Sequence, residues 1–148
     1  MSGDLGRFVE AQDGVFEQVR RELRDGRKRS HWMWFVFPQL TGLGNSAMAR
    51  HYAIASLDEA DAYLRHPILR PRLIECTELV NKVEGRSVNE IFGNPDDMKF
   101  HSCMTLFASV PNPPPVFGDA LAKYFDGARN RLTVETLAIK ASALRSVI

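Results

Sequence analysis

The residues best suited to binding or catalysis gather in residues 30–46, whose sequence is SHWMWFVFPQLTGLGNS. This segment brings together His31, Trp32, Trp34 and Gln39. Indole and imidazole rings can stack on a planar ligand, and an amide can donate and accept hydrogen bonds at the ligand's edge. We therefore expect these four residues to contribute to a small-molecule site. The alternative is that the tryptophans anchor the core and that their N–H groups bond to protein acceptors.

The same segment ends in a glycine turn followed by a helix start. Glycines allow the backbone to approach a phosphate closely, and the first N–H groups of a helix lack partners within the helix. An arginine one helical turn further on would add positive charge. The pattern predicts an anionic ligand, although glycines before a helix can also serve only to turn the chain. The residues predicted to contact the ligand here are Gly42, Gly44, Asn45, Ser46 and Arg50.

A second set of candidates lies on the helix predicted for residues 96–107, DDMKFHSCMTLF. Its apolar residues occupy more than one side, so it should be buried on several faces and should place Lys99 and Ser102 near the interior. A lysine beside a carboxylate can tune proton affinities, although an ordinary ion pair is commoner. If the protein is an enzyme, we expect a glycosidic or phosphoester hydrolase, with Asp97 or His31 as general acid or base and Lys99 stabilising negative charge.

Several other kinds of site are not indicated. The four histidines lack the spacing of a metalloprotease motif and the two cysteines lack that of a zinc site, so we predict no metal and no cofactor. Cys76 and Cys103 fall in predicted helices, and free thiols suit a cytoplasmic protein. A net charge of +1 gives no general reason to favour nucleic acid as a partner. No stretch approaches an apolar membrane span, so no membrane contact is expected.

The elements that must position these residues are predicted to be helices. Apolar residues recur at helical spacing along most of the chain, and capping boxes begin at Ser56 and Ser87. The predicted helices cover residues 5–11, 13–25, 46–53, 57–66, 71–83, 95–110, 116–126 and 133–145, with a short turn at 89–93.

Residues 32–37 have the composition of a strand, but no comparable segment exists to pair with them. We therefore expect an extended or single-turn element that ends at Pro38. The expected fold is all-α. It is one compact domain, residues 1–148, of about six to eight helices with this aromatic segment threaded through the core.

Three stretches resemble a known family: HWMWFVFPQLTGLGNS, YLRHPILRPRL and EIFGNPDDMKFHSCMTLF. They are similar to a bacterial family called domain of unknown function 1810, some members of which carry the label calpastatin. The resemblance covers nearly the whole chain and implies a small, mainly helical, cytoplasmic protein without an established activity. The calpastatin label does not fit, because such inhibitors resemble disordered, repetitive chains. A fainter likeness, in residue types and architecture only, is to a helical family that handles ADP-ribose, and it transfers no catalytic role.

One leading hypothesis and two alternatives follow. The leading hypothesis is a pocket between residues 31–46 and 96–107 that binds or hydrolyses a phosphorylated, nucleotide-like small molecule of the ADP-ribose type. One alternative is a protein-interaction module without catalysis, whose tryptophans would lie on an exposed apolar surface. The other is nucleic-acid binding through the basic stretch at residues 20–29. The burial of Trp34 and Lys99 separates the three, and the sequence indicates no oligomeric state.

Overall fold

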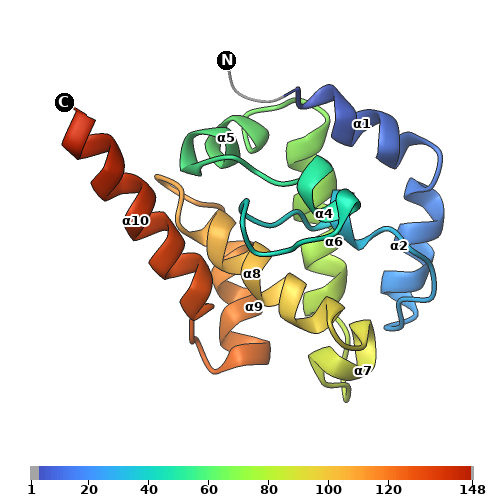
Figure 1. The fold of residues 1–148 in the computed structure, drawn as a ribbon. Coiled ribbons are helices and arrows are strands. Elements are labelled where there is room, and N and C mark those ends of the chain that lie inside the picture. Colours follow the sequence, from blue (N-terminus) through green and yellow to red (C-terminus); the bar gives the residue numbers. More distant parts are fainter. Residues whose placement is uncertain (1–3, 148) are drawn as a thin grey trace.

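The computed structural model describes residues 4–147, with side chains for residues 4–143, as an all-α fold (Figure 1). This confirms the predicted fold class. Within that range the structure has ten helices, more than the six to eight expected. In chain order they are α1 (Gly6–Asp13), α2 (Phe16–Arg24), α3 (Met33–Val36), α4 (Ala47–His51), α5 (Leu57–Tyr63), α6 (Leu69–Asn81), α7 (Val88–Phe92), α8 (Asp96–Ala108), α9 (Pro115–Phe125) and α10 (Arg131–Val147).

The buried apolar side chains form one cluster around α8 and α6. Helix α8 packs against α5, α7, α9 and α10, while α6 packs against α2 and α9. Six consecutive residues of α8, from Ser102 to Phe107, are buried. The helix is therefore covered on more than one side, as its sequence predicts. Helices α1 and α2 lie on one flank of this centre and α10 lies on the opposite flank (Figure 1).

Serine residues cap three short helices. The hydroxyls of Ser46, Ser56 and Ser87 each accept a hydrogen bond from the N–H group three residues further on. The capping box predicted at Ser87 is complete. The box predicted at Ser56 is not, because the carboxylate of Glu59 accepts instead from the N–H of Ala55, at 2.7 Å.

The aromatic segment forms α3, a single helical turn, followed by a loop. A parallel bridge joins Leu40 to Ile54. The N–H of Thr41 donates to the carbonyl of Ile54 at 2.8 Å, and the N–H of Ile54 donates to the carbonyl of Gln39 at 2.8 Å. This bridge ties the start of the loop to the chain that follows α4, so the turn between them is held at both ends.

Most long helices begin and end within a few residues of their predicted bounds. Helices α1 and α2 separate at Gly14, close to the break predicted between residues 5–11 and 13–25. Helix α10 begins at Arg131, earlier than predicted, because the side chain of Asn130 accepts from the N–H of Thr133 at 3.0 Å and so starts the helix. No helix in residues 4–147 is both long enough and apolar enough to cross a membrane.

Candidate ligand-binding site

A pocket lies between the loop after α3, the region of α4 and the first turns of α8. About 360 Å³ of space lies between its walls, including the mouth, but the centres of water-sized molecules fit in only about 20 Å³. We call it the Lys99 pocket. In this form it admits one small polar group. The predicted site residues that line it are Trp34, Gln39, Gly42, Gly44, Arg50 and Lys99.

Lys99 supplies positive charge to the pocket. Its side chain is only 20% exposed, and its ammonium lies 5.0 Å from the centre of the Trp34 ring, within range of a cation–π contact. The ammonium also lies 3.6 Å from one oxygen of Asp96, whose other oxygen is 2.8 Å from Lys28. One carboxylate is thus shared by two ammonium groups, which leaves an excess positive charge. Because Lys28 makes the closer ion pair, Lys99 keeps charge available for an anion.

The indole N–H of Trp34 is buried and has no hydrogen-bond partner among the described residues. Among the described residues it is the only buried side-chain donor without a hydrogen-bond partner. Buried polar groups are nearly always paired, because an unpaired donor loses its hydrogen bonds to water without replacement. Since the Trp34 ring lines the Lys99 pocket, an acceptor atom of a ligand is a fitting partner for this N–H.

Three more lining side chains have polar groups that donate and accept no hydrogen bond within the described part of the chain: Gln39, Thr41 and Tyr52. They are half-buried, so water can reach them. With Trp34 and Lys99 they form a concave wall that is rich in donors. Such a wall suits a ligand that carries several acceptor atoms.

Glycine is required at position 44, because a Cβ atom there would lie 2.7 Å from a side-chain carbon of α4. Gly42 has a φ of +91°, which also favours glycine. Arg50 donates from its guanidinium to the carbonyl of Asn45, and Ser46 caps α4. Asn45 and Ser46 do not line the pocket. Their observed contacts shape the turn, and the geometry gives no support to their predicted contact with a ligand.

A wider groove adjoins the Lys99 pocket and runs along α8 to the start of α10. Gln39 and Lys99 line both spaces, and the groove is open to water-sized molecules over about 150 Å³. Ser102, a predicted ligand contact, lines it, although the Ser102 hydroxyl donates to the carbonyl of Met98 at 3.1 Å. We call this space the α10 groove. Its other walls are Leu43, Pro95, Met98, Asn130 and Leu132.

The model of a protein family described as "Protein of unknown function (DUF1810)" matches residues 2–137. The chain belongs to this family. The DUF1810 protein is also similar to a solved structure, that of the conserved hypothetical protein Rv1873 from Mycobacterium tuberculosis. The two are 59% identical, the match covers 91% of this chain and 96% of that one, and the TM-score is 0.90. No curated protein matches. The family resemblance in the sequence is thereby confirmed.

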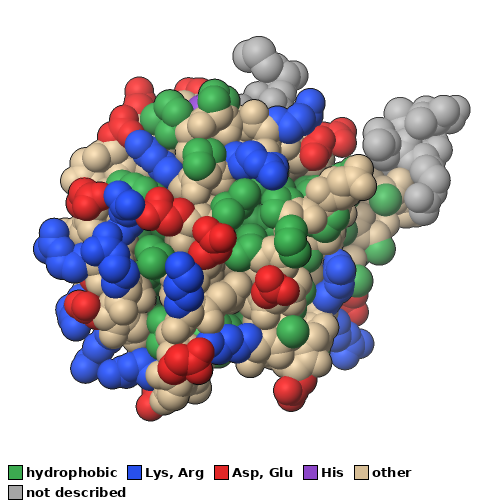
Figure 2. Space-filling model, turned by 180° about the vertical axis from the view of Figure 1, so that it is seen from behind, with side chains coloured by type: hydrophobic (Ala, Val, Ile, Leu, Met, Phe, Trp, Pro, Cys, Tyr) green, Lys and Arg blue, Asp and Glu red, His purple; other side chains and the backbone are tan. Residues whose placement is uncertain are grey.

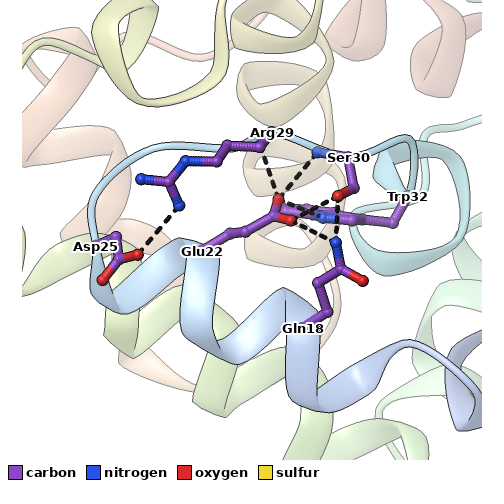
Figure 3. Close-up of polar contacts among 6 residues, drawn as sticks. All are labelled: Gln18, Glu22, Asp25, Arg29, Ser30 and Trp32. Atoms are coloured by element: carbon purple, nitrogen blue, oxygen red, sulfur yellow. Dashed lines mark hydrogen bonds and ion pairs between the residues drawn. The ribbon is translucent and has the colours of Figure 1, made fainter.

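Trp32 of this DUF1810 protein lies in the core, so its position gives no support to its predicted contact with a ligand. Only 1% of the residue is exposed, and its N–H donates to Glu22 at 3.0 Å (Figure 3). The ammonium of Lys28 lies 5.2 Å from the centre of its ring. Because its one donor is satisfied and its ring is enclosed, Trp32 offers nothing to a ligand.

Glu22 is the centre of a closed network between α2 and the segment that follows it (Figure 3). Its carboxylate accepts from Trp32, from the N–H groups of Arg29 and Ser30, from the Ser30 hydroxyl and from Gln18. Burial by itself would raise the pKa of Glu22, but the hydrogen bonds, led by those from Ser30 and Arg29, lower it to about 2. We call this network the Glu22 cage.

His31 and Asp97, the predicted acid–base residues, line neither the pocket nor the groove. His31 is exposed. Asp97 accepts from the side-chain amides of Asn89 and Asn94, at 3.1 and 3.4 Å, and from the N–H of Met98 at 2.8 Å. In the part of the chain that is described, no Asp, Glu or His lines either space, and no three metal-binding side chains cluster. The described lining of the two spaces therefore holds neither of the predicted acid–base residues.

The basic stretch at residues 20–29 is partly neutralised. Arg20, Lys28 and Arg29 form ion pairs with acidic side chains. Figure 2 shows that Lys and Arg side chains gather at one side of the molecule with acidic side chains among them. This mixture differs from the continuous basic face that nucleic-acid binding requires.

The sequence did not single out several lining residues. Thr41 begins the glycine turn that the sequence predicts as a site, although it is not among the predicted ligand contacts. Tyr52 reaches the Lys99 pocket only because the Leu40–Ile54 bridge brings the chain after α4 back to the loop. Leu132 reaches the groove only because α10 packs on α8, which no local pattern reveals.

Proposed function

We propose that this DUF1810 protein binds a phosphorylated, nucleotide-like small molecule of the ADP-ribose type at the Lys99 pocket. The observation that carries the proposal is the buried, unpaired N–H of Trp34 in the same pocket as a lysine whose charge is only partly neutralised. A phosphate oxygen would accept from both groups. Hydrogen bonds of this charged type are stronger than neutral ones.

The arrangement of Asp96 with its two lysines supports an anionic ligand. Lys28 holds Asp96 at 2.8 Å and would remain its partner if Lys99 turned toward a phosphate. Moving Lys99 would then leave no carboxylate unpaired, so the cost of the movement is small. Arg50 also lines the pocket and adds a second positive charge.

The site supports binding more strongly than hydrolysis. Its described lining contains no carboxylate or imidazole that could transfer a proton to a substrate. The roles predicted for Asp97 and His31 therefore receive no support, and Lys99 is proposed as a binding residue. A protein-interaction module is also less well supported, because Trp32 is enclosed and Trp34 is half-buried against Lys99.

The test is a thermal-shift and calorimetric screen with ADP-ribose, nucleotides and phosphosugars. A ligand at a hundred times its Kd should stabilise the wild type by about 2.7 kcal/mol. Lys99→Met keeps the aliphatic stem and removes the charge, so we expect binding at least about tenfold weaker. Because Asp96 keeps Lys28, the variant should fold normally.

Lys82→Met is the matched control, since Lys82 is exposed and lines neither space. It should bind as the wild type does. The proposal is wrong if no compound stabilises the wild type, or if Lys99→Met and Lys82→Met bind the ligand equally well.

A further inference from the structure

We propose that the α10 groove is the subsite for the ring system of the ligand, so that the ligand is a nucleoside phosphate rather than a phosphosugar. This inference rests on the proposed function and assigns a second part of the same molecule. The Lys99 pocket has room for one polar group, and Lys99 and Gln39 also line the groove. A ligand anchored at Lys99 therefore extends into the groove.

Half of the residues that line the groove are apolar. Met98 is 59% exposed and Leu132 is 61% exposed, and these two large apolar side chains line the same space with Leu43 and Pro95. Exposed apolar side chains that gather in one hollow, rather than lying scattered, mark a binding surface. A heteroaromatic ring has a flat, weakly hydrated face that can pack against these apolar side chains.

Polar side chains line the same groove as these apolar residues. The amide of Gln39 can both donate and accept, and it makes no hydrogen bond among the described residues. The NH₂ group of Asn130 likewise donates no hydrogen bond in the described structure. A ring with apolar faces and polar edges matches this arrangement, whereas a sugar would leave Met98 and Leu132 uncovered.

The groove is held by fixed elements. The N–H of Asn130 donates to the hydroxyl of Thr105 on α8 at 2.8 Å, and the Asn130 side chain accepts from Thr133 at the start of α10. These bonds fix the first turn of α10 against α8, and with it the position of Leu132 in the groove wall. A preformed groove of this kind loses little entropy when a ligand enters.

The test compares AMP with ribose 5-phosphate, which lacks only the base, by isothermal titration calorimetry. We expect the wild type to bind AMP at least about tenfold more tightly, because the base covers apolar surface in the groove. Leu132→Ser should weaken the binding of AMP by about fivefold and change the affinity for ribose 5-phosphate by less than about twofold. Ile139→Ser is the matched control, since Ile139 is 68% exposed on the same helix and lines neither space.

The outcomes separate the two proposals. If AMP and ribose 5-phosphate bind the wild type equally, the ring subsite is wrong while anion binding at Lys99 stands. The same holds if Leu132→Ser weakens both ligands alike, or if Ile139→Ser weakens AMP as much as Leu132→Ser does. If neither compound binds the wild type, the proposed function fails and the subsite fails with it.

Discussion

Trp32 and Trp34 are two positions apart, and each has a lysine ammonium about equally far from its ring, at 5.2 Å for Lys28 and 5.0 Å for Lys99. They differ in the hydrogen-bond partners of their indole N–H groups. The N–H of Trp32 donates to the buried carboxylate of Glu22, whereas the N–H of Trp34 has no partner in the described structure. One ring thus belongs to the Glu22 cage and the other to the Lys99 pocket.

The two regions contain the same residue types, but one is a closed stabilising network and the other is the proposed binding site. In the Glu22 cage one acceptor serves several donors, so the polar groups satisfy one another and rigidify the chain. In the Lys99 pocket, by contrast, the N–H of Trp34 and the side-chain amide of Gln39 have no hydrogen-bond partner among the described residues. Asp96 connects the two regions, because it pairs with the lysine of each tryptophan.

The largest expected effect comes from breaking the Glu22 cage. Glu22→Gln replaces a charged acceptor with an amide whose NH₂ group faces other donors, so we expect a loss of about 4 kcal/mol in the free energy of unfolding. Urea denaturation at pH 7 measures it. Glu90→Gln, at an exposed capping box, is the control and should cost less than about 1 kcal/mol. A loss as small as the control's would contradict the stabilising role of the cage.

A slightly smaller effect should appear on acidification. The pKa of Glu22 in the folded protein is about 2, below the ordinary 4.5, so its contribution is complete above pH 5 and is lost as the pH falls from 4.5 toward 2. The shift corresponds to about 3 kcal/mol. The difference in stability between the wild type and Glu22→Gln, measured by urea denaturation, should therefore shrink as the pH falls through this window. A difference independent of pH would show that Glu22 is not held ionised by the cage.

The fold could be predicted largely from local patterns. The break between the first two helices and the cap at Ser87 depend on residues close in the sequence, so the pattern predicted each of them. Exact helix starts were harder, as at α10, because the capping residue Asn130 is itself held by Thr105 on a distant helix.

The site could be predicted only in part. The density of functional residue types located the loop after α3, and the two-sided apolar pattern of α8 placed Lys99 near the interior. Nothing local distinguished Trp32 from Trp34, because the distinction depends on Glu22, which a different helix contributes. The groove wall at Leu132 likewise depends on how α10 packs.

The smallest expected effect is the change produced by replacing each tryptophan in turn, and it is the most diagnostic one. The sequence contains only these two, so Trp32→Phe and Trp34→Phe each leave a single tryptophan. Trp34→Phe keeps an aromatic ring and removes the unpaired N–H. It should change the free energy of unfolding by less than about 0.5 kcal/mol. Because one hydrogen bond to the ligand is lost, it should weaken the binding of ADP-ribose by about fivefold. Trp32→Phe should lower the free energy of unfolding by about 2 kcal/mol and leave the affinity for ADP-ribose unchanged.

The most direct measurement is a fluorescence titration of these two variants with ADP-ribose, with excitation of tryptophan alone. The account predicts a saturable change in the emission of Trp34 in the Trp32→Phe protein and no change in the emission of Trp32 in the Trp34→Phe protein. A response from Trp32 with a silent Trp34, or silence from both, would contradict the assignment of Trp34 and Lys99 to the binding site.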